Sequence, residues 1–276
     1  MSHDELAPGV KISEAFAKVA VTYTEAFPHF RIYARHSIDH APPLTSDSVV
    51  HDNASGPGAV STAIIAQFEK KSEKVPKLIA TDANPAMVAQ AKKENPGLDA
   101  RVMDSTSLEL GDGSITHSFT NFLLSPLFPK GKNVDIAKNV RKTIAPGGTA
   151  TFACWCYLEW LVMLRDAANA VRPGGEEFVP THDYSEDLIR ETLVEGGFAT
   201  ENLSFVRHES LGDAFTPGPS KDQMTLVGGL MGGMVTATWS DEEKELFKSK
   251  LHAELDRAVE EGTRYKMAAM VVTAKC

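Results

Sequence analysis

The chain has 276 residues, of which 42% are hydrophobic and 24% charged. This is the composition of an ordinary globular protein, and it excludes collagen-like, low-complexity and disordered chains. Its 28 Lys and Arg residues against 37 Asp and Glu residues leave a net charge of −9. Because an acidic surface repels phosphate backbones, nucleic acid is not an expected partner.

The cysteine count and the hydropathy pattern indicate a cytoplasmic protein. Cys154, Cys156 and Cys276 are an odd set without paired C-x-x-C spacing, so we expect neither disulfides nor a metal site. The N-terminus lacks the order of a secretory signal peptide. Residues 144–164 and 223–240 are interrupted by glycine or charge and do not read as membrane spans. We expect no membrane partner, and a monomer or homodimer.

In chain order, the first part is helical and the middle alternates. Residues 12–27 and 30–38 carry apolar side chains at helical spacing, which predicts two helices. Strands and helices then alternate, which indicates βαβ units and a parallel sheet with helices on both faces. The predicted strands are 49–50, 77–81, 100–103, 115–122 and 149–155, and the predicted helices between them are 59–70, 85–95 and 134–144.

Beyond residue 155 the alternation loosens. Helices are predicted at 158–171 and 185–195, and strands at 203–208 and 267–273. A further helix begins at Ser240, where Ser240 and Glu243 have capping-box spacing and Trp239 is placed as a hydrophobic staple. We therefore expect one domain, divided into an N-terminal helical flap (1–45), a cofactor-binding core (46–210), a cap insertion (211–265) and a last strand (266–276).

The strongest local motif follows the first predicted strand and reads Asp52-Asn53-Ala54-Ser55-Gly56-Pro57-Gly58. Glycine lets the backbone turn tightly and approach a ligand, and the next helix offers free N–H groups at its N-terminus. The motif therefore predicts a ligand at the carboxyl end of this strand. Taken alone it is weak evidence, because any tight strand-to-helix turn uses glycine.

Two aspartates at later strand ends make the ligand more specific. Asp82 ends the second strand, 24 residues past Gly58, where its carboxylate can accept hydrogen bonds from the two hydroxyls of a ribose. Asp104 ends the third strand 22 residues later, where it and the backbone of Ser105 can accept the exocyclic amine of adenine. Dinucleotide binding is disfavoured, because its third glycine is missing from the residues after Gly58.

On these motifs the chain, from about Tyr23 to Lys275, resembles the class I S-adenosylmethionine-dependent methyltransferases. The glycine motif is similar to that family's acidic residue followed by G-x-G-x-G, with Ala54 in place of the first glycine. The same replacement occurs in fungal secondary-metabolite methyltransferases, among them the enzyme that methylates the thiols of reduced gliotoxin. The resemblance implies a Rossmann-like α/β fold with a seven-stranded, mostly parallel sheet whose last strand is antiparallel, and Pro146-Gly147-Gly148 before the fifth strand matches it.

The resemblance also implies the cofactor and its contacts. The cofactor is S-adenosylmethionine and the product S-adenosylhomocysteine. Tyr23 resembles a position that closes over the methionine end, although its helical spacing also fits core packing. The implied cofactor-binding residues are Tyr23, Asp52, Asn53, Ala54, Gly56, Gly58, Asp82, Ala83, Met87, Asp104, Ser105, Asn121 and Phe122.

The candidate residues for binding the methyl acceptor lie in the later, apolar part of the sequence. His182 is a candidate general base for a phenol or amine, although a lone histidine is also commonly structural. The candidate substrate-binding residues are Trp155, Phe178, Tyr184, Phe215 and Met231. We expect methyl transfer to oxygen, sulfur or nitrogen of a small, apolar secondary metabolite. The alternative is a methyltransferase-like protein that binds the cofactor without transferring its methyl group, as a cyclase or a regulator.

Overall fold

The computed structural model describes residues 5–7, 10–11, 20, 29–125, 129–173, 184–213, 236 and 238–276. Contacts within the chain divide it into two units. The core unit comprises residues 27–155, 184–208 and 269–276, and the accessory unit comprises residues 1–26, 156–183 and 209–268. Residues 27–45 of the predicted flap therefore belong to the core unit. The predicted division into flap, core and cap stays a prediction.

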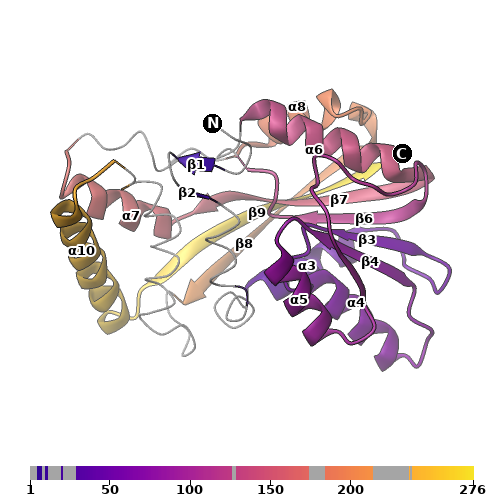
Figure 1. Ribbon diagram of the computed structural model, residues 1–276, viewed down its shortest axis with the longest axis horizontal. Coiled ribbons are helices and arrows are strands. Elements are labelled where there is room, and N and C mark those ends of the chain that lie inside the picture. The colour runs from indigo at the N-terminus through magenta and orange to yellow at the C-terminus, as the bar shows by residue number, and fades with distance from the viewer. Residues whose placement is uncertain are drawn as a thin grey trace. The chain divides into compact units, whose positions relative to one another are not determined.

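A seven-stranded sheet, with the strand order β5-β4-β3-β6-β7-β9-β8, organises the fold (Figure 1). The pairs β3/β4, β3/β6, β4/β5 and β6/β7 are parallel. The last strand, β9, runs antiparallel to β7, because Cys276 is bonded to Gly147 near the start of β7 and Lys266 to Glu159 just past its end. The predicted fold class is confirmed. The strands are β3 (Val49–Asn53), β4 (Lys77–Asp82), β5 (Asp99–Val102), β6 (Ile115–Asn121), β7 (Ile144–Leu158), β8 (Leu203–Asp213) and β9 (Arg264–Lys275).

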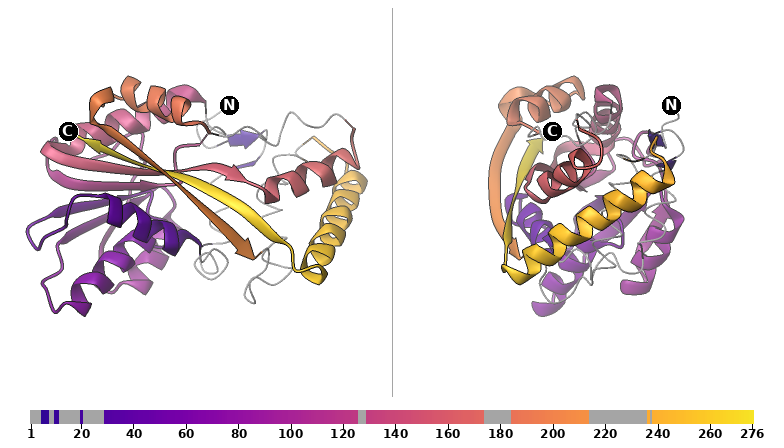
Figure 2. Two further views of the ribbon diagram at one scale, coloured as in Figure 1. Left: turned by 180° about the vertical axis from the view of Figure 1, so that it is seen from behind. Right: turned by 90° about the vertical axis from the view of Figure 1, so that its left-hand side faces the viewer.

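Helices cover both faces of the sheet in the core unit (Figures 1 and 2). On one face, Val50 and Phe119 of the sheet pack against Ile38 of α3 and Ile64 of α4 in a buried cluster. The other face is covered by α6 and α8, and a short 3-10 helix (Thr200–Asn202) leads into β8. The helices are α3 (His29–His40), α4 (Ala59–Lys70), α5 (Pro85–Glu94), α6 (Lys130–Thr143) and α8 (Glu186–Glu195).

Strand β7 is longer than the predicted strand 149–155 because it includes the Pro-Gly-Gly segment. Gly147 donates its N–H to the carbonyl of Cys276 (2.7 Å), and Cys276 donates to Gly148 (2.9 Å), so β9 extends the pairing to this end. A Cβ on Gly148 would lie 2.9 Å from the carbonyl oxygen of Thr116. Glycine is needed there for the close approach of β6 and β7.

The N-terminal segment contains a small hairpin that the hydrophobic pattern did not predict. Strands β1 (Glu5–Ala7) and β2 (Val10–Lys11) pair antiparallel. Its sequence signal is the Pro-Gly dipeptide between the two strands. The first predicted helix falls on residues 12–27, nearly all of which lie outside the described residues, and the second is confirmed as α3.

The accessory unit is built around two helices, α7 (Trp160–Asn169) and α10 (Asp241–Glu260). They share a buried cluster that includes Leu164, Leu251 and Trp239. The predicted capping box is confirmed, because the N–H of Ser240 donates to Glu243 Oε2 (2.8 Å) and the N–H of Glu243 donates to Ser240 Oγ (3.3 Å). Trp239, predicted as a hydrophobic staple, packs edge-on against Phe247, with ring centroids 5.9 Å apart. No helix among the described residues has the length and apolar character needed to cross a membrane.

Candidate active site

The glycine motif forms a loop between β3 and α4 that is tied to the end of β4. Ala54, Gly56 and Gly58 have φ values of 51°, 53° and 90°, all in the left-handed region. The N–H of Ser55 donates to the carbonyl of Thr81 (2.9 Å), and the N–H of Gly56 donates to Asp82 Oδ2 (2.8 Å). The loop and the predicted ribose-binding carboxylate are therefore one hydrogen-bonded structure.

Ala54 stands where the resemblance places a glycine, and its backbone keeps the glycine conformation. For an alanine, the left-handed conformation costs roughly 1–2 kcal/mol, because Cβ approaches the following carbonyl oxygen. The bonds from Ser55 and Gly56 to β4 hold this conformation. The substitution is thus accommodated with local strain rather than by a different loop.

Replacing Ala54 by glycine is expected to raise the free energy of unfolding by up to about 1 kcal/mol, since relief of the strain outweighs the extra chain entropy of glycine. The matched control is Ala89, which is exposed in α5, where the same change should cost about 1 kcal/mol. Urea unfolding of both variants measures the difference. Equal losses at the two positions would contradict a strained Ala54.

Asp82 is half-buried, with one backbone donor on each carboxylate oxygen. Oδ2 accepts from Gly56 and Oδ1 accepts from the N–H of Asn84 (2.8 Å). Burial raises the pKa of Asp82, and these two hydrogen bonds oppose the rise. Each oxygen keeps a second lone pair, so the carboxylate can still accept two hydroxyl groups.

The segment after Asp82 begins α5 with favourable capping. The side chain of Asn84 accepts from the N–H of Ala86 (2.9 Å), and Pro85 occupies the first helical position. Of the two other residues predicted in this segment, Ala83 is exposed and Met87 is buried. Of these two residues, Ala83 is therefore the one whose side chain a ligand can reach in this structure.

Asp104 and Ser105 form the turn after β5. Asp104 is exposed, and its Oδ1 accepts from the N–H and the hydroxyl of Thr106, both at 2.8 Å. Its Oδ2 makes no hydrogen bond to any residue that the structure describes, which leaves it available to an amine donor. Ser105 is 7% exposed, and its hydroxyl donates to Asn53 Oδ1 (2.8 Å).

Asp52 and Asn53 lie beneath the loop rather than on its surface, with 3% and 1% of their area exposed. Asp52 Oδ2 accepts from the N–H (2.9 Å) and hydroxyl (2.7 Å) of Ser61 in the first turn of α4. Burial raises the pKa of Asp52 to about 7, although both bonds from Ser61 oppose the shift. The described contacts of Asp52 therefore fix the start of α4.

The end of β6 carries an aromatic cluster, formed by Phe30, Tyr33, Phe122 and Trp155. Phe122 has φ 60° and stacks on Trp155, with ring centroids 4.1 Å apart and an interplanar angle of 17°. Tyr33 of α3 meets both rings edge-on, at 5.5 Å and 4.9 Å. A bulky residue in the left-handed region is rare and marks a position held by its surroundings.

Helix α3 also holds Asn121, the residue before Phe122. The hydroxyl of Ser37 donates to Asn121 Oδ1 at 3.0 Å. Sequence reasoning did not select Tyr33 or Ser37 for the site. The sequence marked Tyr33 only as one apolar position of a predicted helix, and no sequence pattern indicated a role for Ser37.

The remaining predicted residues are placed in the core or not described. Tyr184 is 4% exposed, its phenol oxygen lies 3.4 Å from Thr192 Oγ1 of α8, and burial raises its pKa to about 12. These are the contacts of a core residue, and its predicted contact with the acceptor stays a prediction. The predicted residues that lie outside the described residues are Tyr23, Phe178, His182, Phe215 and Met231.

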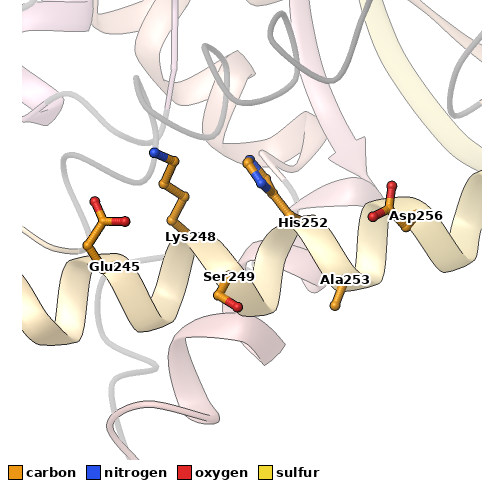
Figure 3. Close-up of a pocket in the computed structure, with 6 residues that line it drawn as sticks. All are labelled: Glu245, Lys248, Ser249, His252, Ala253 and Asp256. Atoms are coloured by element: carbon orange, nitrogen blue, oxygen red, sulfur yellow. The ribbon is translucent and has the colours of Figure 1, made fainter.

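Two further observations concern other kinds of site. Within the described part of the chain, no group of three His, Cys, Asp or Glu side chains could hold a metal ion. A hollow of about 400 Å³ lies along α10 (Figure 3), lined by Glu245, Lys248, Ser249, His252, Ala253 and Asp256. Its lining comes from one helix and includes none of the predicted cofactor or acceptor residues.

Comparison with known proteins gives relatives of one class. The methyltransferase tpcH of Aspergillus fumigatus is 21% identical over 93% of this chain and 88% of its own length. The methyltransferase ktnA of Aspergillus niger is 23% identical over 83% of this chain and 84% of its own length. An acetylaranotin bis-thiomethyltransferase of Aspergillus terreus is 22% identical over 71% of this chain and 68% of its own. No model of a known protein family matches the chain.

Solved structures agree on the fold. Phosphoethanolamine N-methyltransferase 2 of Haemonchus contortus, crystallised with S-adenosylhomocysteine, superposes with a TM-score of 0.53 at 12% identity, over 97% of this chain and 60% of that one. A protein of Bacillus halodurans assigned as a methyltransferase gives 0.52 at 13% identity, over 88% and 97%. The class predicted from the sequence is confirmed: this is an S-adenosylmethionine-dependent methyltransferase of the class I fold, with relatives among fungal methyltransferases.

Proposed function

We propose that the protein transfers the methyl group of S-adenosylmethionine to oxygen, sulfur or nitrogen of a small, apolar secondary metabolite. The observation that carries the cofactor part is the pairing of Asp82 with the strained loop at Ala54–Gly58. Both Asp82 oxygens are fixed by backbone N–H groups while retaining acceptor capacity, which suits the two hydroxyls of a ribose. Asp104 Oδ2, at the next strand end, suits the amine of adenine.

The chain's own contribution to the reaction is positioning. When bound, the cofactor would supply a methyl group on a sulfonium, and an acceptor lone pair would displace the thioether: the new bond to the methyl carbon forms as the carbon–sulfur bond breaks, and the acceptor's proton passes to solvent or, for a phenol or amine, to the candidate base His182. Holding donor and acceptor in line removes most of the entropy cost of such a displacement. Asp82 and Asp104 would hold the adenosine, and the segment Asn121–Phe122 would adjoin the methyl group.

The aromatic cluster is the described feature best suited to an apolar acceptor. Phe122 and Trp155 are only partly buried, although they are large aromatic side chains in a packed sheet. Aromatic rings of this kind provide apolar contact area for small ligands. The relative that is a bis-thiomethyltransferase makes a thiol one of the acceptor groups to test.

Replacing Trp155 by alanine is expected to raise the acceptor KM by about tenfold or more, because a buried aromatic contact of roughly 1.5 kcal/mol or more is lost. The dissociation constant of S-adenosylhomocysteine should stay within about twofold, since donor contacts come from other strand ends. Trp155→Phe keeps the stack on Phe122 and serves as the control. Weaker cofactor binding with normal acceptor kinetics would contradict this division of roles.

The proposed function is tested by the mass of the product. The protein is incubated with isotopically labelled S-adenosylmethionine and an extract of fungal metabolites, and products are identified by mass spectrometry. Transfer adds one labelled methyl group per event and releases S-adenosylhomocysteine. A cyclase would change its substrate without adding mass, and a regulator would bind the cofactor without any product; either result would overturn the proposal.

The small-molecule acceptor is part of the same proposal. The predicted cytoplasmic location, monomeric or homodimeric state and lack of nucleic-acid binding stay predictions. His182 as a general base also stays a prediction. Replacing His182 should affect the rate of methyl transfer most if the acceptor found in the extract is a phenol or amine.

A further inference from the structure

A network of buried, hydrogen-bonded polar side chains crosses the sheet beneath the glycine-motif loop between β3 and α4. Asn53 is its centre: Oδ1 accepts from Ser105 Oγ (2.8 Å) and from Thr81 Oγ1 (3.4 Å), and Nδ2 donates to Thr120 Oγ1 (3.1 Å). Strand register explains the meeting, because Asn53 is paired with Thr81 of β4 and with Thr120 of β6. Residues paired in a parallel ladder point to the same face.

The network continues to His51. His51 Nε2 lies 2.8 Å from Thr81 Oγ1, within hydrogen-bond distance, and the tautomer of His51 decides which of the two atoms donates. Burial lowers the pKa of His51 to about 4, so the imidazole stays neutral near pH 7.

The interior of a parallel sheet covered on both faces is normally apolar. Burying several amide, hydroxyl and imidazole groups costs free energy unless each is hydrogen-bonded. Here they bond to one another, and a fully satisfied buried network specifies one geometry.

Ser105 is the one member of the network outside the strands. It follows β5, and β4 lies between β5 and β3 in the sheet. The bond from Ser105 to Asn53 therefore reaches across β4 and holds the turn after β5 against β3. The next residue, Thr106, is held by α6, because Asn139 Nδ2 of that helix donates to the carbonyl of Thr106 (2.8 Å).

We infer that Asn53 is a positioning residue for nucleobase recognition: through Ser105 it fixes the turn that presents Asp104 to the adenine amine. Asn53 is buried, so it acts on the base through Ser105 rather than by contact. The inference rests on the proposed function, because it assumes that adenine lies at Asp104. It predicts that selectivity for adenine, and not only affinity, depends on the Ser105 hydroxyl.

The test compares two ligands that differ at one edge of the base. S-adenosylhomocysteine has an amine at C6 beside an unprotonated N1, and S-inosylhomocysteine has a carbonyl at C6 beside an N1–H. Titration calorimetry on the full chain should show that the parent protein prefers the adenosyl ligand by about tenfold or more. Ser105→Ala should raise the dissociation constant of the adenosyl ligand by about five- to tenfold and leave that of the inosyl ligand within about twofold, so that selectivity is lost.

Thr120→Val is the matched control. It removes another hydrogen bond of Asn53 in the same buried network, but on the side away from Asp104, so selectivity should remain. Ser105→Thr keeps the hydroxyl and should restore selectivity. Thermal unfolding of each variant confirms that it is folded, and Ser105 lies in a turn, so its truncation leaves the strand contacts of Asn53 in place.

The inference is overturned if Ser105→Ala weakens both ligands equally or neither, or if Thr120→Val reduces selectivity as much as Ser105→Ala. Those results would mean that the network stabilises the core and has no role in base selectivity. If the parent protein bound neither ligand, the proposed function itself would fail. The two failures are therefore distinguishable.

Discussion

Replacing Asp82 by alanine is expected to weaken the binding of S-adenosylhomocysteine by about 2 to 4 kcal/mol, which is roughly 30- to 1000-fold in dissociation constant. Two charged hydrogen bonds to the ribose would be lost. In addition, the N–H groups of Gly56 and Asn84 would lose their acceptor, so the loop around Ala54 would be less firmly held. Titration calorimetry measures the change directly.

Two further variants separate these effects. Asp82→Asn retains one carbonyl acceptor without charge, so its affinity should lie between those of the parent and Asp82→Ala. Asp99→Asn changes an exposed carboxylate that is paired with Arg101, and it should leave cofactor affinity unchanged. If Asp82→Ala bound S-adenosylhomocysteine as tightly as the parent, Asp82 would only anchor the loop.

The second large effect is a pH dependence of stability that comes from Asp52. Burial raises its pKa from 3.8 to about 7, so between these values the folded protein binds more protons than the unfolded chain. The contribution of Asp52 to the free energy of unfolding therefore falls as the pH rises from about 4 to 7, by roughly 4 kcal/mol. Asp52→Asn cannot ionise, so its stability relative to the parent should rise by about this amount over the same range.

His51 acts in the opposite direction. Its pKa is lowered from 6.5 to about 4, so the folded protein binds fewer protons than the unfolded chain between these values. Its contribution to the free energy of unfolding rises with pH in this window, by roughly 3 kcal/mol. The two trends oppose each other in the parent protein.

Urea unfolding between pH 4 and 7 should therefore give three distinct profiles. Relative to the parent, Asp52→Asn gains stability as the pH rises, and His51→Gln loses it. Asp112→Asn, at an exposed carboxylate, should follow the parent. A constant difference between Asp52→Asn and the parent at every pH would mean that Asp52 keeps an ordinary pKa in the folded state.

Much of the fold could be predicted because its elements follow simple periodicities. Alternating strand and helix patterns placed β3, β4 and β6 with helices α4, α5 and α6 between residues 49 and 143, and the capping box at Ser240 marked the start of α10. The hairpin of β1 and β2 was missed, because its strands are too short to show a period of two. The extension of β7 was missed because it depends on pairing with the distant last strand.

The candidate site could be predicted only where a residue type marks its own role. Asp82 and Asp104 stand out as acids at strand ends, and glycine marks the left-handed loop. Asn53 was predicted as a cofactor contact because it belongs to the motif, and that contact stays a prediction; its hydrogen bonds within a buried network were not predicted. Such contacts depend on strand register, which no single stretch of sequence specifies.

The measurement that tests the central claim most directly is titration calorimetry of the purified protein with S-adenosylmethionine, S-adenosylhomocysteine and NAD. The first two share the adenosine that Asp82 and Asp104 are placed to recognise, whereas the loop lacks the glycine spacing of a dinucleotide site. We predict binding of both sulfur compounds with micromolar dissociation constants and no binding of NAD. Binding of NAD without heat from either sulfur compound would contradict the methyltransferase assignment.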